Sequence, residues 1–324
     1  MSKGRLFITG MGGMLGRFLA SKAIEEGYEV GGTLHTSTPS EIKKLCENGI
    51  IKSYFLDLIE PHEIKKAILD FKPDIAIHLA GRVLGSQDSN VTNKKVFDEN
   101  TAIIKNTLSA VKTLSNLPRF ILVSGCIVYD RLSSKDFVTE MGVDKLPLVD
   151  TLEQPYRSSR IEQEKILAAE NNLEYIIVRP TQITGPGKIP GVVEYFIAKE
   201  VISAVHDETK RTIQIGNKMG EVDIVDVRDA ARALLALVER GKNKEIYHLS
   251  SGSPETVASL IKVFLETAEL KPEEYKIISQ NEEKSNYFRF SAEKLRKLGW
   301  EPEFELKETV RNYFEYFKER YKYE

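Results

Sequence analysis

The first half of the chain alternates short apolar runs with longer stretches whose apolar residues recur at helical spacing. In one such stretch, Leu15, Leu19 and Ala23 fall on the same face of a helix that Gly27 ends. The predicted strands are 5–10, 28–34, 53–58, 74–81, 119–125 and 174–180, and the helices between them are 14–27, 41–49, 62–71, 93–114 and 157–171. This alternation predicts right-handed βαβ units, and therefore an α/β fold with a doubly wound parallel sheet.

The pattern is less regular after the strand 174–180. Predicted helices are 191–205, 228–241, 254–268, 291–300 and 306–322, and predicted short strands are 212–216, 222–227, 245–251 and 274–279. No polar linker separates the halves. We therefore expect a sheet domain of residues 1–180, to which 223–250 return, and a smaller interleaved C-terminal lobe of 181–222 and 251–324. The aromatic-rich final helix is predicted to dock its apolar face on this lobe rather than on a partner.

Composition and charge exclude several classes of function. The formal net charge of the 324 residues is -2, with both signs mixed along the chain, which disfavours nucleic acid or an anionic membrane as partner. The two cysteines form no disulfide framework, and no stretch is long and apolar enough for a signal peptide or a membrane span, so we expect a cytoplasmic protein. The five histidines show no ligand spacing, which predicts no metal site and leaves a small molecule as the expected partner.

Three glycines stand at the junction of the first predicted strand and helix. Gly10, Gly13 and Gly16 are spaced as in turns that bring a pyrophosphate close to a helix N-terminus, where free N–H groups favour negative charge. This position predicts a dinucleotide cofactor. The acidic residue expected near the end of the second strand is absent, and His35 and Thr36 stand there instead. Because an acid would repel a 2′-phosphate and these side chains can bind one, the sequence favours NADP over NAD.

With these residues, the chain resembles the extended short-chain dehydrogenase/reductases. Within them it is most similar to the GDP-mannose dehydratase and GDP-4-keto-6-deoxymannose reductase type. The stretches that carry the resemblance are TGMGGMLG (9–16), HLAG (78–81), SGCIVY (124–129), PYRSSR (155–160), VRPTQITGPG (178–187), DIVDVRDAARA (223–233) and LGWEP (298–302). The resemblance implies a Rossmann-type sheet and a homodimer formed through helices 93–114 and 157–171.

The resemblance also assigns site residues. Those implied for the cofactor are Gly10, Gly13, Met14, Leu15, Gly16, His35, Thr36, Asp57, Leu58, Leu79, Ala80, Gly81, Asn100, Tyr156, Arg160 and Pro180. Those implied for the substrate are Arg82, Cys126, Gln182 and Lys284. Those implied for catalysis are Tyr156, Arg160 and one or both of Ser124 and Cys126.

Tyr156 and Arg160 are one helical turn apart, so both side chains should share a face. A free tyrosine ionises with a pKa of about 10, and a nearby cation lowers it, so Tyr156 can serve as acid and base with Arg160 as the cation. The family has a lysine where Arg160 stands, and an arginine keeps the charge but is longer, planar and never deprotonated. At the family's serine or threonine position stands Gly125. If strand alternation continues, its neighbours Ser124 and Cys126 point away from the face of Gly125, and a bend after the strand is needed to bring one in.

The missing groups discriminate between reactions. No acidic residue follows Gly125 for a 4,6-dehydratase, and Gly187 replaces the histidine of a 3,5-epimerase/reductase. Val222 stands where the family often has an arginine that clamps a diphosphate. The sequence therefore favours an NAD(P)-dependent reductase or C4 epimerase of a nucleotide-activated sugar. The alternatives are a cofactor-binding sensor or scaffold with degraded catalysis, and a reductase of non-sugar carbonyls.

Overall fold

A seven-stranded parallel sheet forms the core of the computed structural model, which describes residues 2–35, 40–82, 92–129, 135–151, 153–187, 191–281 and 287–321. Its strand order is β11-β6-β5-β4-β1-β2-β3. The strands are β1 (Arg5–Thr9), β2 (Glu29–Leu34), β3 (Ile51–Phe55), β4 (Ile75–His78), β5 (Arg119–Val123), β6 (Tyr175–Pro180) and β11 (Glu245–Leu249). The predicted doubly wound α/β fold is confirmed.

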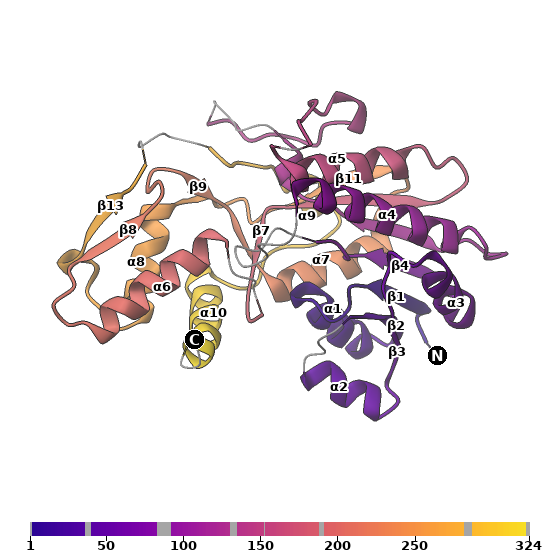
Figure 1. Cartoon of the computed structure of the whole chain (residues 1–324), viewed down its shortest axis with the longest axis horizontal. Coiled ribbons are helices and arrows are strands. Elements are labelled where there is room, and N and C mark those ends of the chain that lie inside the picture. Colours follow the sequence, from indigo (N-terminus) through magenta and orange to yellow (C-terminus); the bar gives the residue numbers. More distant parts are fainter. Residues whose placement is uncertain are drawn as a thin grey trace.

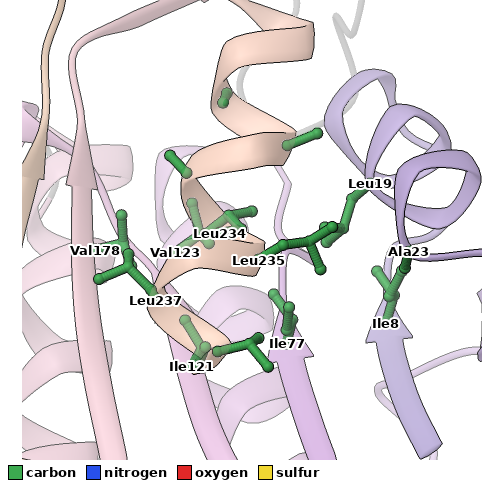
Figure 2. Packing of buried hydrophobic residues seen from close by; sticks show 14 of the residues in the cluster. Ile8, Leu19, Ala23, Ile77, Ile121, Val123, Val178, Leu234, Leu235 and Leu237 are labelled. Carbon is green, nitrogen blue, oxygen red and sulfur yellow. The ribbon is translucent and has the colours of Figure 1, made fainter. Parts of the chain in front are cut away.

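Helices cover both faces of the sheet (Figure 1). On one face lie α1 (Met14–Glu25), α2 (Ser40–Glu47) and α7 (Val227–Arg240); on the other lie α3 (Pro61–Phe71), α4 (Asn93–Val111) and α5 (Pro155–Ala168). Successive strand residues feed opposite cores: Leu6 and Ile8 pack under α1 and α7, and Phe7 packs under α3. Figure 2 shows the first core, where leucines of α1 and α7 meet β-branched side chains of the strands.

A third apolar cluster lies in the smaller lobe, which Figure 1 shows beside the sheet. It is built by α6 (Val193–His206), β8 (Thr212–Ile215), α8 (Val257–Thr267) and α10 (Leu306–Tyr321), with β13 (Lys276–Ser279) paired in parallel to β8. The final helix buries Val310, Tyr313 and Phe314 in this cluster, as predicted. The short helix α9 (Glu293–Arg296) packs instead on the sheet side, where Leu295 joins the first core.

A short strand that the sequence did not predict leads from the sheet to the lobe. β7 (Gln182–Thr184) follows β6 after one residue and pairs in parallel with β10 (Ile224–Asp226). The single strand expected over 222–227 is split, because β9 (Glu221–Val222) pairs instead with β12 (Glu255–Thr256). Single-turn 3₁₀ helices are η1 (Cys126–Val128), η2 (Val143–Lys145) and η3 (Pro272–Glu274). Within the described residues, no helix combines the length and apolarity needed to cross a membrane.

Candidate active site

A cavity of about 390 Å³ opens at the carboxyl ends of the sheet strands, where the strand order reverses between β1 and β4. Doubly wound sheets bind their ligands at this kind of point. The residues that line it are Gly10, Gly13, Met14, Leu15, Gly16, Leu79, Gly81, Val123, Ser124, Gly125, Ile127, Tyr156, Arg160, Pro180, Thr181, Gln182, Ile183, Gly187, Val192 and Phe288. The structure therefore brings ten predicted cofactor residues to one cavity, among them the predicted catalytic residues Tyr156 and Arg160. It adds two further predicted catalytic or substrate residues, Ser124 and Gln182.

The glycine turn is shaped for close approach of a ligand. Gly10 has φ +72°, and a Cβ there would lie 3.1 Å from the backbone of Ala80. A Cβ on Gly16 would lie 2.5 Å from the carbonyl oxygen of Gly10. Gly13 begins α1 without a side-chain cap, so the first N–H groups of the helix are free for an anion. These features fit the pyrophosphate of a dinucleotide, with Gly10, Gly13 and Gly16 as its cradle.

Tyr156 and Arg160 face this cavity from the first turns of α5. The guanidinium carbon of Arg160 lies 5.0 Å from the centre of the Tyr156 ring, so the predicted sharing of a face is confirmed. Arg160 is only 5% exposed, and its Nη1 donates to Val123 O at 3.3 Å and to Gln163 Oε1 at 2.9 Å. Within the described part of the chain it has no carboxylate partner within 4.0 Å. The cavity thus contains a positive charge that no described side chain neutralises.

The bend after β5 separates the two candidate polar assistants. Gly125 is extended, and η1 follows it directly. Ser124 lines the cavity, and its buried Oγ has no hydrogen-bond partner among the described residues.

Cys126 is turned away from the cavity, although the sequence analysis named it as a candidate for both catalysis and substrate binding. It is 1% exposed, and its Sγ donates to Arg179 O at 3.2 Å. Burial raises the pKa of this thiol well above its usual range, which keeps it protonated. The structure therefore corrects that expectation, because the 3₁₀ turn rotates the cysteine into an apolar cluster.

Other predicted residues lie near the cavity without lining it. Asn100 is fully buried, accepts from Arg82 N at 2.6 Å and donates to Ser159 Oγ at 3.0 Å, so it holds the chain after β4 against α5. Ala80 underlies the glycine turn. The Arg82 guanidinium pairs with Glu99 at 2.5 Å, which occupies one predicted substrate contact with an internal ion pair.

The residues predicted for the adenosine end are more dispersed. Asp57 caps its own turn by accepting from Ile59 N at 3.0 Å, and Leu58 is buried against the second core. His35 is exposed at the end of β2. These assignments stay predictions, as do those of Thr36 and Lys284, which lie outside the described residues.

Sequence reasoning missed a buried polar network beneath the site. Arg179 of β6 forms two hydrogen bonds with Glu164 of α5, at 3.0 and 2.6 Å, and both side chains are fully buried. Arg179 Nη1 also donates to Tyr129 Oη at 2.6 Å, and Tyr129 Oη lies 2.6 Å from His248 Nε2. Because Tyr129 Oη also accepts from Met141 N, its own proton goes to His248, whose ring nitrogen accepts. The network ties the helix that carries Tyr156 to the sheet.

Two buried histidines are neutral in the folded protein. Burial and, second, the charge of Arg160 lower the pKa of His78 from 6.5 to about 3. Burial and, second, the charge of Arg179 lower the pKa of His248 from 6.5 to about 3. Both histidines stay unprotonated at pH values where the unfolded chain takes up their protons.

This difference predicts acid sensitivity. Because the pKa of each histidine is lower in the folded than in the unfolded chain, its contribution to the free energy of unfolding is fully present above about pH 6.5. As the pH falls from there toward 3, this contribution is lost at about 1.4 kcal/mol per pH unit. We expect the free energy of unfolding, measured in urea, to be about 4 kcal/mol lower at pH 5 than at pH 7. His248→Gln should roughly halve that difference, and an unchanged difference in this variant would contradict the assignment.

Comparison with known proteins decides the family. The model of the NAD dependent epimerase/dehydratase family matches residues 6–250, which is most of the chain. The chain belongs to this family. The resemblance noted in the sequence is thereby confirmed, and the chain is an enzyme of a family that depends on a nicotinamide dinucleotide.

Individual relatives are distant but cover nearly the whole chain. GDP-6-deoxy-D-mannose reductase of Pseudomonas aeruginosa is 22% identical over 320 residues, 95% of either chain. The structure of RMD from P. aeruginosa complexed with NADPH has a TM-score of 0.73 at 21% identity, over 98% of this chain and 100% of that one. The dTDP-glucose 4,6-dehydratase of Bacillus anthracis in complex with NAD has a TM-score of 0.80 at 15% identity, over 98% of both chains. At these identities the structures show the shared fold.

Proposed function

We propose that this family member is an NAD(P)-dependent reductase or C4 epimerase of a nucleotide-activated keto sugar, with NADP as the preferred cofactor. One observation carries the proposal: Tyr156, the buried cation of Arg160 and Ser124, whose hydroxyl has no partner among the described residues, line the same cavity as the glycine turn. Support for the substrate class comes from relatives named as a GDP-6-deoxy-D-mannose reductase and a UDP-glucose 4-epimerase.

The side chains supply proton transfer and charge stabilisation. When bound, a nicotinamide cofactor supplies or accepts the hydride at the sugar carbon. Tyr156 gives its proton to the carbonyl oxygen in reduction and removes it in oxidation. The positive charge of Arg160 stabilises the negative charge left on Tyr156, and the Ser124 hydroxyl donates to the same substrate oxygen.

The cavity favours these reactions over dehydration. A 4,6-dehydratase of this family needs an acidic side chain beside the sugar to move a proton. No aspartate or glutamate is among the described residues that line the cavity. Reduction and C4 epimerisation need only the hydride, the tyrosine and the cation, so they fit the groups present.

Replacing Arg160 tests whether this arginine binds the cofactor in place of the lysine that the family has at this position. Charge-assisted hydrogen bonds contribute about 1.5–3 kcal/mol, so Arg160→Met should weaken NADPH binding about tenfold to hundredfold, measured by fluorescence titration. The matched control is Arg311→Met, which removes the same charge from the exposed side of α10 and should leave the affinity unchanged.

Turnover is measured on a panel of nucleotide sugars with NADPH and NADH. We expect oxidation or reduction, or interconversion of C4 epimers, with at least one panel member. Tight dinucleotide binding without turnover across the panel would support the alternative of a sensor or scaffold with degraded catalysis. NADPH binding to Arg160→Met as tight as to the wild type would contradict the role of the cation.

A further inference from the structure

A buried carboxylate stands directly behind one wall of the cavity. Glu194, in the first turn of α6, is 0% exposed. Its two oxygens accept from Gln182 Nε2 at 2.9 and 3.1 Å, and one of them also accepts from Thr184 Oγ1. In the described ranges no lysine or arginine lies within 4.0 Å of it. Burying a charge without a cation costs free energy, and here the hydrogen bonds from Gln182 and Thr184 offset part of that cost.

The carboxylate fixes the orientation of Gln182. An ionised carboxylate only accepts hydrogen bonds, so the NH₂ end of the Gln182 amide must face Glu194. The opposite end is Oε1, which no described donor binds, and Gln182 lines the cavity. Gln182 therefore offers an acceptor to a ligand and withholds its donors.

The distribution of charge around Gln182 also disfavours an anionic ligand group at this wall. Ile183, Val192 and Phe288 are apolar residues of the same cavity lining as Gln182, and Arg160 is the one cation among the described residues of that lining. The negative charge of Glu194 acts through a poorly polarisable interior, which raises the energy of an anion placed against Gln182. A hydroxyl, which can donate to Oε1, meets no such cost.

We propose that Glu194 is a positioning residue that sets substrate specificity: by orienting Gln182, it selects a neutral sugar hydroxyl and rejects a carboxylated sugar. This inference rests on the proposed function and names the substrate class more narrowly. Glu194 acts through Gln182 and does not touch the substrate itself.

The test compares matched pairs of nucleotide sugars on the NADPH-loaded protein by isothermal titration calorimetry. The pairs are UDP-glucose with UDP-glucuronate and GDP-mannose with GDP-mannuronate, so that only a hydroxymethyl and a carboxylate differ. We expect the neutral member of the better-bound pair to bind at least about tenfold tighter. In Glu194→Gln the amide of Gln182 can turn over and the buried charge is gone, so this preference should fall to near parity through tighter uronate binding.

A second variant keeps the inference testable if Glu194→Gln does not fold. Gln182→Met keeps the side-chain length and removes the acceptor, so it should weaken binding of the neutral sugar about tenfold and leave the uronate no weaker. Gln214→Met, the same exchange at an exposed position of β8, should change neither affinity.

The outcomes separate the two proposals. A wild-type preference for the uronate, or an unchanged preference in Gln182→Met, would overturn this inference and leave the proposed function standing. Failure of every nucleotide sugar to bind the NADPH-loaded protein would overturn the proposed function and this inference with it.

Discussion

Replacing Tyr156 with phenylalanine is expected to lower turnover by a factor of about 10² to 10⁴, which is the usual contribution of a positioned acid or base. The exchange removes one hydroxyl and keeps the ring against which the Arg160 guanidinium lies. The cavity should therefore keep its shape, and the Kd for NADPH should change by less than about tenfold, the worth of one hydrogen bond.

The experiment measures kcat and the Kd for NADPH on the same preparations, with the nucleotide sugar that the wild-type protein turns over. Tyr316→Phe, at a half-buried tyrosine of α10 that is not among the residues lining the cavity, is the matched control and should keep wild-type kcat. If kcat of Tyr156→Phe stayed within about twofold of the wild type, another group would have to move the proton.

The largest expected loss of stability comes from Glu164→Gln. This glutamate and Arg179 are fully buried and joined by two hydrogen bonds, so the substitution leaves an uncompensated guanidinium in the core. Breaking one partner of such a pair costs about 3 to 5 kcal/mol. We expect that decrease in the free energy of unfolding at pH 7.

The free energies of unfolding in urea are compared for Glu164→Gln and for a control variant of α5, Glu162→Gln. Glu162→Gln changes the same group two residues earlier, at a half-exposed position, and should cost about 0.5 kcal/mol or less. A Glu164→Gln variant as stable as Glu162→Gln would mean that water or a rearranged partner satisfies Arg179, and the ion pair would then be of no consequence for stability.

The parts of this molecule that depend on local spacing were predictable from sequence. Alternating apolar runs and helical periods gave the parallel sheet, because side-chain period follows directly from backbone geometry. The shared face of Tyr156 and Arg160 followed from four residues in one helix, and the structure confirms it. The glycine turn was likewise recognisable because its steric demand is local.

The parts that depend on tertiary contacts were not predictable. Whether Ser124 or Cys126 reaches the cavity is decided by the 3₁₀ turn after Gly125, and strand alternation cannot foresee that turn. The partnership of Gln182 and Glu194 depends on β7, whose three residues are too few for a periodic signal and which exists through pairing with β10. The Glu164–Arg179 pair joins a helix and a strand, and charge alone gave no sign that both would be buried.

The position of β11 has a consequence for how the protein is made. This strand completes the sheet beside β6, yet in the chain it follows α6, β8 and α7. During synthesis the backbone N–H and C=O groups on this edge of β6 therefore have no strand partner until residue 249 has left the ribosome. An uncovered strand edge is a template for pairing with other chains. A nascent chain stalled before that point would present this edge to chaperones or aggregate, so the sheet is completed only after α6 and β8, the first elements of the smaller lobe, have been synthesised.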